Sequence, residues 1–174
     1  MQEASSMFLD HVIRQHIIRP VRYLDLCAAP GGKTTLALSA LPEGSLVVCN
    51  EIVRNRAHVL EENIIKWGNP YCIVTNNDSA TFNSLKHYFD VILADVPCSG
   101  EGMFRKDRKM VKAWEEHGPE FFVKIQRSII TQAAQMLKPG GMLLYSTCTF
   151  SPEENEQTIE FLLQEYPQFK ICDI

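Results

Sequence analysis

The sequence lacks the cysteine and histidine patterns that hold metals or staple small scaffolds. Its six cysteines are spread along 174 residues, with no C-x-x-C pair and no tight cluster with the five histidines. No H-E-x-x-H pairing occurs either, so we expect no metal site. Most of the cysteines are therefore expected to be small buried hydrophobic residues in a reducing compartment.

Long apolar runs and an excess of positive charge are also missing. No run approaches the roughly 18 residues that span a bilayer, and the first 16 residues lack the apolar stretch of a signal peptide. We therefore expect a cytoplasmic protein without membrane contact. Seventeen Lys and Arg against 21 Asp and Glu give a net charge of −4, so any contact with nucleic acid must be local.

The composition is that of a globular protein with a core, at 45% hydrophobic and 22% charged residues. No internal repeat, low-complexity tract or linker divides the chain. We expect a single domain over residues 1–174. Nothing in the sequence indicates its oligomeric state.

Five short apolar runs rich in β-branched residues predict strands, at 21–26, 45–50, 71–75, 90–95 and 142–146. Helices are expected between and around them, at 5–18, 33–41, 54–67, 119–137 and 152–165. The runs are continuous rather than alternating, which is typical of parallel strands covered on both faces. The fold class is therefore α/β, with a doubly wound, Rossmann-like sheet whose ligand lies at the carboxyl ends of the strands.

Local signals mark the ends of two of these helices. Ser151, Pro152 and Glu154 predict an N-cap, a proline at the first helical position and a capping-box glutamate. The segment Lys138-Pro139-Gly140-Gly141 is expected to stop the helix before the last strand.

A loop of small residues follows the first strand and leads into a helix: Cys27, Ala28, Ala29, Pro30, Gly31, Gly32 and Lys33. Such residues let the backbone approach a ligand, and the helix N-terminus favours an anionic or polar group. This favours nucleotide or nucleoside binding over a plain tight turn. A phosphate loop would need glycine where Cys27 stands, so a P-loop-like NTPase, with Asp95 as its Walker B acid, is only an alternative.

Polar side chains follow the next two strands. Glu51 ends the second strand, where an acid of a Rossmann fold binds ribose hydroxyls; the alternative is a solvated surface glutamate. Asn76, Asn77 and Asp78 follow the third strand and could hold an adenine edge or simply form a turn. Together with the loop, they indicate a nucleoside-bearing cofactor across the sheet edge.

Two cysteines stand after the last two strands. Cys98 follows the fourth strand and Cys148 the fifth, so a parallel sheet places both at the edge of the cofactor loop. A thiolate that adds to carbon 6 of a pyrimidine makes carbon 5 able to attack an electrophilic methyl group. The site must then lower a thiol pKa of about 8.5 or remove its proton.

Three segments resemble the signature motifs of the NOL1/NOP2/Sun family of S-adenosylmethionine-dependent RNA cytosine carbon-5 methyltransferases. They are DLCAAPGGKT at 25–34, DVPCSG at 95–100 and STCT at 146–149. The longer run DVPCSGEGMFRKD at 95–107, with QEASSM at 2–7, is most similar to the bacterial branch that modifies small-subunit rRNA or, in relatives, tRNA.

The resemblance implies distinct roles for the two strand-end cysteines. Cys148 is the nucleophile that attacks carbon 6, and Cys98 helps to release the enzyme from the methylated base. Lys33 and Asp95 are polar partners of the cytosine ring. The base must be reached unpaired or flipped out, at a cost of a few kcal/mol.

The resemblance also implies how S-adenosyl-L-methionine is held. The loop of residues 27–33 surrounds it, with Glu51 on the ribose hydroxyls, Asp78 near the adenine, and Asp95 beside the methionine part or the target base. RNA, as rRNA or tRNA, is the expected partner.

Members of this family carry RNA-binding elements outside the catalytic domain, and that domain usually ends in a closing β-hairpin. The resemblance thus implies that this chain is a catalytic fragment of a longer protein without the hairpin, and a non-catalytic S-adenosylmethionine-binding fragment is an alternative. The basic run at 105–112 is expected to contact phosphates, unless it is a solvated helix face.

Overall fold

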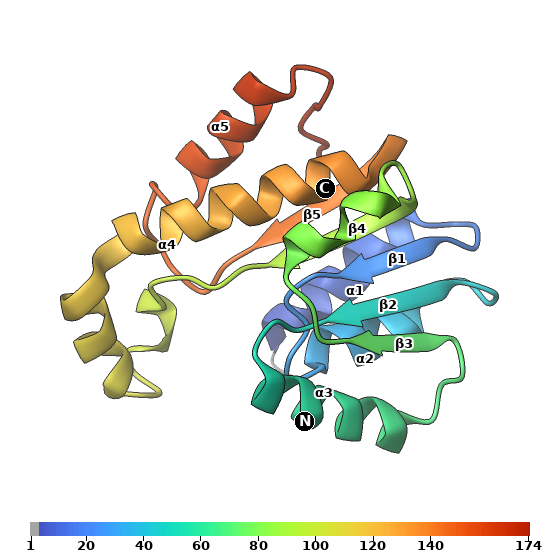
Figure 1. Ribbon diagram of the computed structural model, residues 1–174, viewed down its shortest axis with the longest axis horizontal. Helices are drawn as coiled ribbons and strands as arrows, with labels where there is room; N and C mark the ends of the chain where they lie inside the picture. Colours follow the sequence, from blue (N-terminus) through green and yellow to red (C-terminus); the bar gives the residue numbers. More distant parts are fainter. Residues whose placement is uncertain (1–3) are drawn as a thin grey trace.

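The computed structural model describes residues 4–174, so the first two residues of the QEASSM motif lie outside the described residues. One five-stranded sheet forms the centre, with all neighbouring strands parallel and the order β3-β2-β1-β4-β5 (Figure 1). The strands are β1 (Arg22–Asp25), β2 (Leu46–Asn50), β3 (Cys72–Thr75), β4 (Phe89–Asp95) and β5 (Leu137–Ser146). The predicted Rossmann-like α/β fold is confirmed.

Helices cover both faces of this sheet. They are α1 (Ala4–His16), α2 (Gly32–Ala40), α3 (Arg54–Trp67), α4 (Lys109–Met136) and α5 (Glu156–Glu165), with 3-10 turns η1 (Ser79–Leu85) and η2 (Glu101–Met103). The chain runs outward from β1 to β3 and then returns to place β4 on the other side of β1. This reversal is the topological switch point of an open parallel sheet, so the carboxyl ends of β1 and β4 are where a ligand is expected.

Residues of one strand alternate between two hydrophobic layers. Tyr23 of β1 packs with α1 and α2, whereas its neighbour Leu24 packs with α4 and η1. Both side chains are fully buried. Helix α5 packs against α4 (Figure 1). The contact is formed by Leu162 of α5 with Ile130 and Ala134 of α4. Burial on both faces explains why the strand sequences are continuously apolar.

Two predicted boundaries around the fifth strand differ from the structure. Helix α4 begins at Lys109 rather than residue 119, and Gly118 breaks it with a φ of 63° and a ψ of 174°, which are not helical. Strand β5 begins at Leu137, so the segment 138–141 lies within the strand, where the register with β4 shifts. In this irregular stretch the Lys138 ammonium donates to Asp90 Oδ1 at 2.5 Å. The positive charge of Lys138 is thus paired with the carboxylate of Asp90.

The predicted capping box before α5 is wrong. Helix α5 begins only at Glu156, and residues 152–155 form turns. Ser151 Oγ donates to Glu153 Oε2 at 2.7 Å, while Glu154 turns into the protein interior and is fully buried. Glu154, which the local sequence predicts to cap the helix, is therefore buried in the protein interior instead.

No strand follows β5 in the part of the chain that the structure describes. Within residues 4–174 there is also no helix with both the length and the apolar character needed to cross a membrane.

Candidate active site

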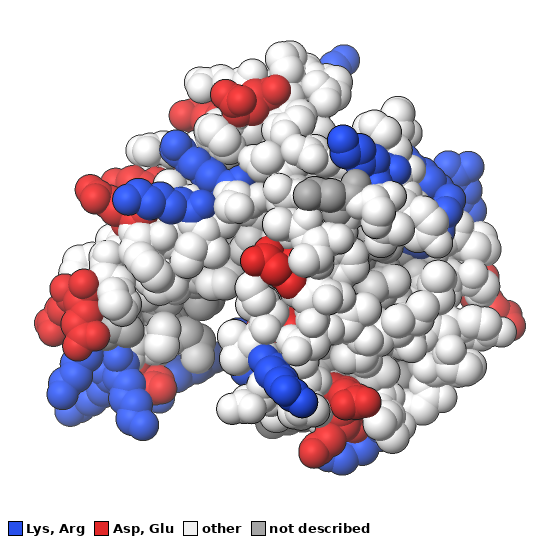
Figure 2. Space-filling model, in the orientation of Figure 1, with Lys and Arg blue, Asp and Glu red and all other residues white. Residues whose placement is uncertain are grey.

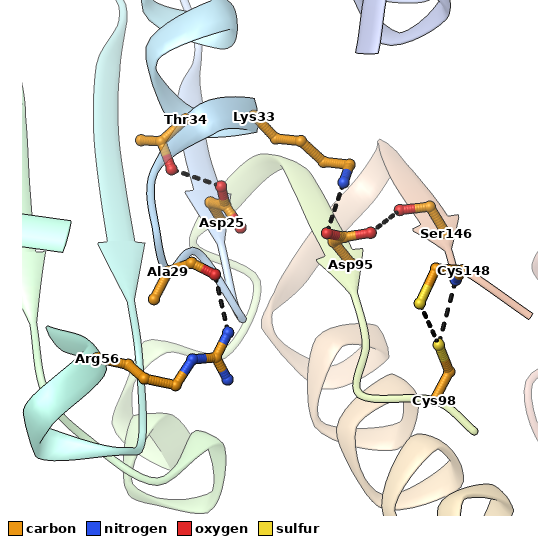
Figure 3. Close-up of polar contacts among 9 residues, drawn as sticks. All are labelled: Asp25, Ala29, Lys33, Thr34, Arg56, Asp95, Cys98, Ser146 and Cys148. Carbon is orange, nitrogen blue, oxygen red and sulfur yellow. Dashed lines mark hydrogen bonds and ion pairs between the residues drawn. The ribbon is translucent and has the colours of Figure 1, made fainter. Parts of the chain in front are cut away.

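The carboxyl ends of β1, β4 and β5 bring together most of the side chains that the motifs single out (Figure 3). Lys33 reaches from the start of α2 toward Asp95 at the end of β4. Cys98 and Cys148 meet in the two loops that follow β4 and β5. The motifs are far apart in sequence, and the parallel sheet alone gathers them at one edge.

The loop after β1 is a tight turn built by its small residues. Gly31 adopts a φ of 106° at the N-terminus of α2, and a Cβ there would lie 3.1 Å from Leu60 Cδ1, so both conformation and space favour glycine. Arg56 of α3 donates to the Ala29 carbonyl at 2.8 Å, and Asn63 donates to the Pro30 carbonyl at 2.7 Å. Helix α3 therefore fixes the outer side of the loop.

Burial raises the pKa of a carboxyl group and of a thiol next to this loop. Burial raises the pKa of Asp25 to about 7, although the Thr34 hydroxyl, which donates to Asp25 Oδ2 at 2.6 Å, opposes the shift. Burial, followed by the charge of Asp25, raises the pKa of Cys27 to about 12. Cys27 is thus a neutral packing residue of the loop and a poor nucleophile.

Glu51 is 2% exposed, so the alternative of a solvated surface glutamate is wrong. Its Oε1 accepts a hydrogen bond from the Val53 backbone at 2.9 Å. Its Oε2 lies 3.4 Å from an Arg56 nitrogen but makes no hydrogen bond among the described residues. An oriented carboxylate oxygen that still lacks a hydrogen bond is suited to accept one from a ligand hydroxyl.

The polar residues after β3 have structural partners. Asn76 donates to the Glu51 carbonyl at 2.6 Å, and the Asn77 carbonyl accepts from Asn50 at 2.9 Å. Asp78 is exposed and caps η1 by accepting from the Ala80 backbone at 2.9 Å. These contacts join the end of β3 to the Glu51 turn, and the adenine role of Asp78 stays a prediction.

Asp95 is held at both carboxylate oxygens. Lys33 Nζ donates to Oδ2 at 2.7 Å, and Ser146 Oγ donates to Oδ1 at 2.6 Å (Figure 3). All three side chains are partly exposed, so the group faces accessible space. Lys33 points away from the loop of residues 27–32, whereas a phosphate-loop lysine would reach the phosphates that such a loop cradles. The arrangement gives the NTPase alternative no support.

The sulfur atoms of Cys98 and Cys148 lie 2.9 Å apart, and the Cys148 backbone donates to the Cys98 sulfur at 3.2 Å. The hydrogen bond from Cys98, helped by the Lys33 charge, lowers the pKa of Cys148 to about 7 against burial and the charge of Asp95. The same contact, with burial, raises the pKa of Cys98. Cys148 is exposed and Cys98 is buried, so the cysteine whose pKa is lowered is also the accessible one.

Comparison with known proteins shows the family of this chain. Residues 18–174 match the family model described as 16S rRNA methyltransferase RsmB/F. The chain belongs to this RsmB/F family. The resemblance to Sun-family methyltransferases is thereby confirmed.

Two curated relatives match this chain over nearly all of its length. It is 39% identical over 168 residues to ribosomal RNA small subunit methyltransferase F of Pectobacterium atrosepticum, covering 96% of this chain and 35% of that protein. It is 38% identical over 164 residues to tRNA (cytosine(49)-C(5))-methyltransferase of Pyrococcus abyssi, covering 94% of this chain and 52% of that one. The chain thus spans about a third to a half of the length of these relatives.

A solved structure shows the same fold. NSun6 from Pyrococcus horikoshii, solved with SFG, has a TM-score of 0.80 and 32% identity, over 94% of this chain and 41% of that one.

The RsmB/F site depends on a buried glutamate whose role in the site the sequence motifs did not reveal. Glu154 Oε2 accepts from the Ser99 backbone at 3.0 Å and from Gln126 Nε2 at 2.7 Å. Gln126 also donates to the Pro97 carbonyl at 2.9 Å, and the Tyr145 hydroxyl donates to the Glu154 carbonyl at 2.6 Å. This network fastens the Cys98 loop to α4 and to the segment after β5.

A glycine holds the other side of the Cys148 loop. The Gly102 backbone donates to the Cys148 carbonyl at 2.9 Å, and a Cβ on Gly102 would lie 2.8 Å from that oxygen. Ser99 and Thr149 join the same two loops through their hydroxyls at 2.9 Å. Contacts on both sides of the cysteine pair therefore fix the positions of Cys98 and Cys148. Of the residues in this arrangement, only the two cysteines were predicted from the sequence.

The basic run at 105–112 lies where η2 leads into α4. Its cationic residues, Arg105, Lys106, Arg108, Lys109 and Lys112, are all exposed. Figure 2 shows Lys and Arg gathered at the lower left, the region that this segment occupies in Figure 1. The run follows η2, the turn whose Gly102 contacts Cys148. Its positive charge therefore lies close to the candidate active site in the chain.

The other cysteines differ in their surroundings. Cys49 is buried and its sulfur lies 3.6 Å from that of half-buried Cys72. Cys172 is exposed, so the expectation of burial is wrong for it, because the segment after α5 lies on the surface. Within residues 4–174 no cluster of His, Cys, Asp and Glu is placed to hold a metal.

Proposed function

We propose that this domain, residues 1–174, transfers a methyl group from S-adenosyl-L-methionine to carbon 5 of a cytosine in rRNA or tRNA. The observation that carries the proposal is the pairing of an exposed Cys148 thiolate with a buried Cys98 thiol, at the sheet edge where Lys33 and Asp95 meet. Family membership supports the RNA substrate, since a relative is named a tRNA cytosine carbon-5 methyltransferase.

The residues after β1 and β2 fit the cofactor. The turn of residues 27–32 offers small side chains, and a Cβ on Gly32 would meet nothing within 4 Å. Glu51 Oε2 makes no hydrogen bond among the described residues and can accept one from a ribose hydroxyl. The NSun6 structure with SFG, an analogue of S-adenosylmethionine, supports binding of this cofactor. When bound, the cofactor supplies an electrophilic methyl group.

The cytosine ring is proposed to bind between Cys148 and the Lys33–Asp95 pair. The Cys148 thiolate forms a bond to carbon 6, and the electron pair of the C5–C6 double bond moves into the ring toward N3 and O2. The Lys33 ammonium can donate to the oxygen where negative charge collects, and Asp95 can accept from the exocyclic amine. Ser146 holds Asp95 in place from the opposite side.

Release of the product needs the proton on carbon 5 to leave. The C5–C6 double bond then re-forms, and the bond from carbon 6 to Cys148 breaks to give the thiolate back. Once the Cys148 sulfur is bonded to carbon, the hydrogen bond that contributes most to the raised pKa of Cys98 is lost, while burial still raises it. Cys98 can then lose its own proton to solvent and accept the proton from carbon 5.

The test uses RNA with 5-fluorocytosine in place of cytosine, because fluorine on carbon 5 prevents the release step. With S-adenosylmethionine, the native protein and Cys98→Ala should form a covalent RNA adduct on a denaturing gel, and Cys148→Ala should not. Cys172→Ala, at an exposed cysteine outside the site, is the matched control and should behave as the native protein. An adduct in Cys148→Ala that is lost in Cys98→Ala would reverse the two roles.

Calorimetry separates the alternatives. The proposal predicts binding of S-adenosylmethionine and no binding of ATP with magnesium. Cofactor binding without any 5-methylcytidine in digested RNA would instead indicate a non-catalytic domain.

A further inference from the structure

Phe150 is a large apolar side chain that the fold leaves in solvent beside the proposed nucleophile. It stands two residues after Cys148 and is 79% exposed, more than any other aromatic side chain that the structure describes. Its exposure contributes nothing to the core, so packing within residues 4–174 does not explain an aromatic ring at this place.

The backbone that presents Phe150 is fixed on both sides. Thr149 and Ser151 are 7% and 5% exposed, and Asn155 donates to the Thr149 carbonyl at 3.2 Å. The Phe150 backbone itself donates to Glu101 Oε2 at 3.1 Å. The ring is therefore held outward by an anchored segment, which lowers the entropy lost when a ligand packs on it.

The ring also lies on the side of the site where RNA would approach. A Cβ on Gly102 would lie 2.8 Å from the Cys148 carbonyl and 4.0 Å from Phe150 Cε2, so nucleophile and ring border the same turn. The exposed cations of the run at 105–112 follow that turn directly. An exposed aromatic ring next to positive charge is how proteins hold unpaired bases, by stacking on the ring and neutralising the phosphates.

We infer that Phe150 is a stacking platform for a nucleobase next to the target cytosine. This inference rests on the proposed function. When a cytosine leaves the stack to reach Cys148, its neighbour loses a stacking partner, and the Phe150 ring replaces it. The platform selects cytosines in single-stranded or splayed RNA over cytosines inside a regular helix.

The test compares four variants of the native full chain on an unstructured cytosine-containing RNA. Phe150→Ala should raise KM for RNA about tenfold, in the range expected for loss of one base–aromatic stack. Phe150→Tyr should restore the native KM, and Phe150→Leu should not, because leucine is apolar without a stacking face. Tyr71→Ala is the matched control, since Tyr71 is 55% exposed but precedes β3, at the opposite end of the sheet.

Further measurements decide whether Phe150 acts on RNA or only supports the fold. Calorimetric affinity for S-adenosylmethionine and the thermal unfolding midpoint should not change in Phe150→Ala; a lowered midpoint would show that the ring packs on protein and would overturn the inference. Equal KM values for Phe150→Leu and Phe150→Tyr would overturn it as well. If the native protein itself methylates no RNA, the proposed function fails, whereas an active native protein with an unchanged Phe150→Ala variant refutes the platform alone.

Discussion

The molecule holds two pairs of neighbouring cysteines, and only one of them lies where chemistry can occur. The sulfur atoms are 2.9 Å apart in the Cys98–Cys148 pair and 3.6 Å apart in the Cys49–Cys72 pair. In each pair the hydrogen bond between the thiols lowers the pKa of one member and raises that of the other. Proximity of two sulfurs therefore does not by itself distinguish a catalytic pair.

Position in the sheet makes the difference. Cys49 lies inside β2 and Cys72 begins β3, so that pair belongs to the sheet interior and packs with α3. Cys98 and Cys148 follow the carboxyl ends of β4 and β5, and Cys148 is exposed. At Cys148 the Lys33 charge favours the thiolate and works against the charge of Asp95, whereas at the other pair the charge of Asp25 disfavours thiolates.

Removing one sulfur from each pair should have very unequal consequences. Cys148→Ala should lower the single-turnover rate of methylation by about a thousandfold or more, as expected when a covalent nucleophile is lost. Cys72→Ala should leave that rate within about threefold, because its thiol is distant from the reacting atoms. Comparable losses in the two variants would contradict the contrast.

Asp95→Asn should lower the same rate by about a hundredfold, the scale on which a single transition-state hydrogen-bonding group contributes. The amide keeps the shape but removes the charge that holds the Lys33 ammonium at 2.7 Å. The variant should have a lower kcat with RNA as substrate. Its affinity for the cofactor, measured by calorimetry, should change by a smaller factor than kcat. Asp90→Asn, at the opposite end of β4 and paired with Lys138, is the matched control and should retain activity.

Alkylation at neutral pH should be about tenfold or more faster at Cys148 than at Cys98, because only a thiolate reacts and the contact between the two sulfurs lowers the pKa of Cys148 and raises that of Cys98. The pKa of Cys148 is about 7, below that of an ordinary thiol, so its thiolate fraction rises tenfold per pH unit below pH 7 and levels off above it. The rate of iodoacetamide labelling at Cys148, followed by peptide mass spectrometry, should show this profile. A midpoint above pH 8 at Cys148 would contradict the pairing.

Glu154→Gln should test whether the Cys98–Cys148 pair depends on the hydrogen bonds that Glu154 makes to Ser99 and Gln126. The amide would place a donor where Glu154 Oε2 accepts from Ser99 and Gln126, and should destabilise the fold by about 1–3 kcal/mol in urea unfolding. It should also move the midpoint of Cys148 alkylation upward, as the Cys98 loop loosens. Glu160→Gln, on exposed α5 surface, should change neither quantity.

Much of this arrangement could be predicted from sequence, for a physical reason. Strands buried on both faces have continuous apolar runs, so the sheet and its functional edge followed from them. Cys98 and Cys148 were then placed at that edge by strand order alone. Which of the two is the nucleophile came from the family resemblance, because spacing does not distinguish them; the exposure and lowered pKa of Cys148 support that role.

The remaining parts of the site depend on contacts between distant segments. Glu154 fitted a local capping pattern, but its partners Ser99 and Gln126 lie in other parts of the chain. Ser146 stood in a motif without any sign that it would hold Asp95. Arg56 carried no motif at all, yet from α3 it holds the loop that follows β1. Such roles emerge only when the packed helices bring these side chains together.

The central claim is that Cys148, and not Cys98, bonds to the base. The most direct test is to trap the native protein on 5-fluorocytosine RNA with S-adenosylmethionine, digest the complex, and map the modified peptide by tandem mass spectrometry. We predict that the nucleotide is attached to Cys148, with Cys98 and Cys72 unmodified. Attachment at Cys98, or methylation of cytosine without any trapped adduct, would contradict the account.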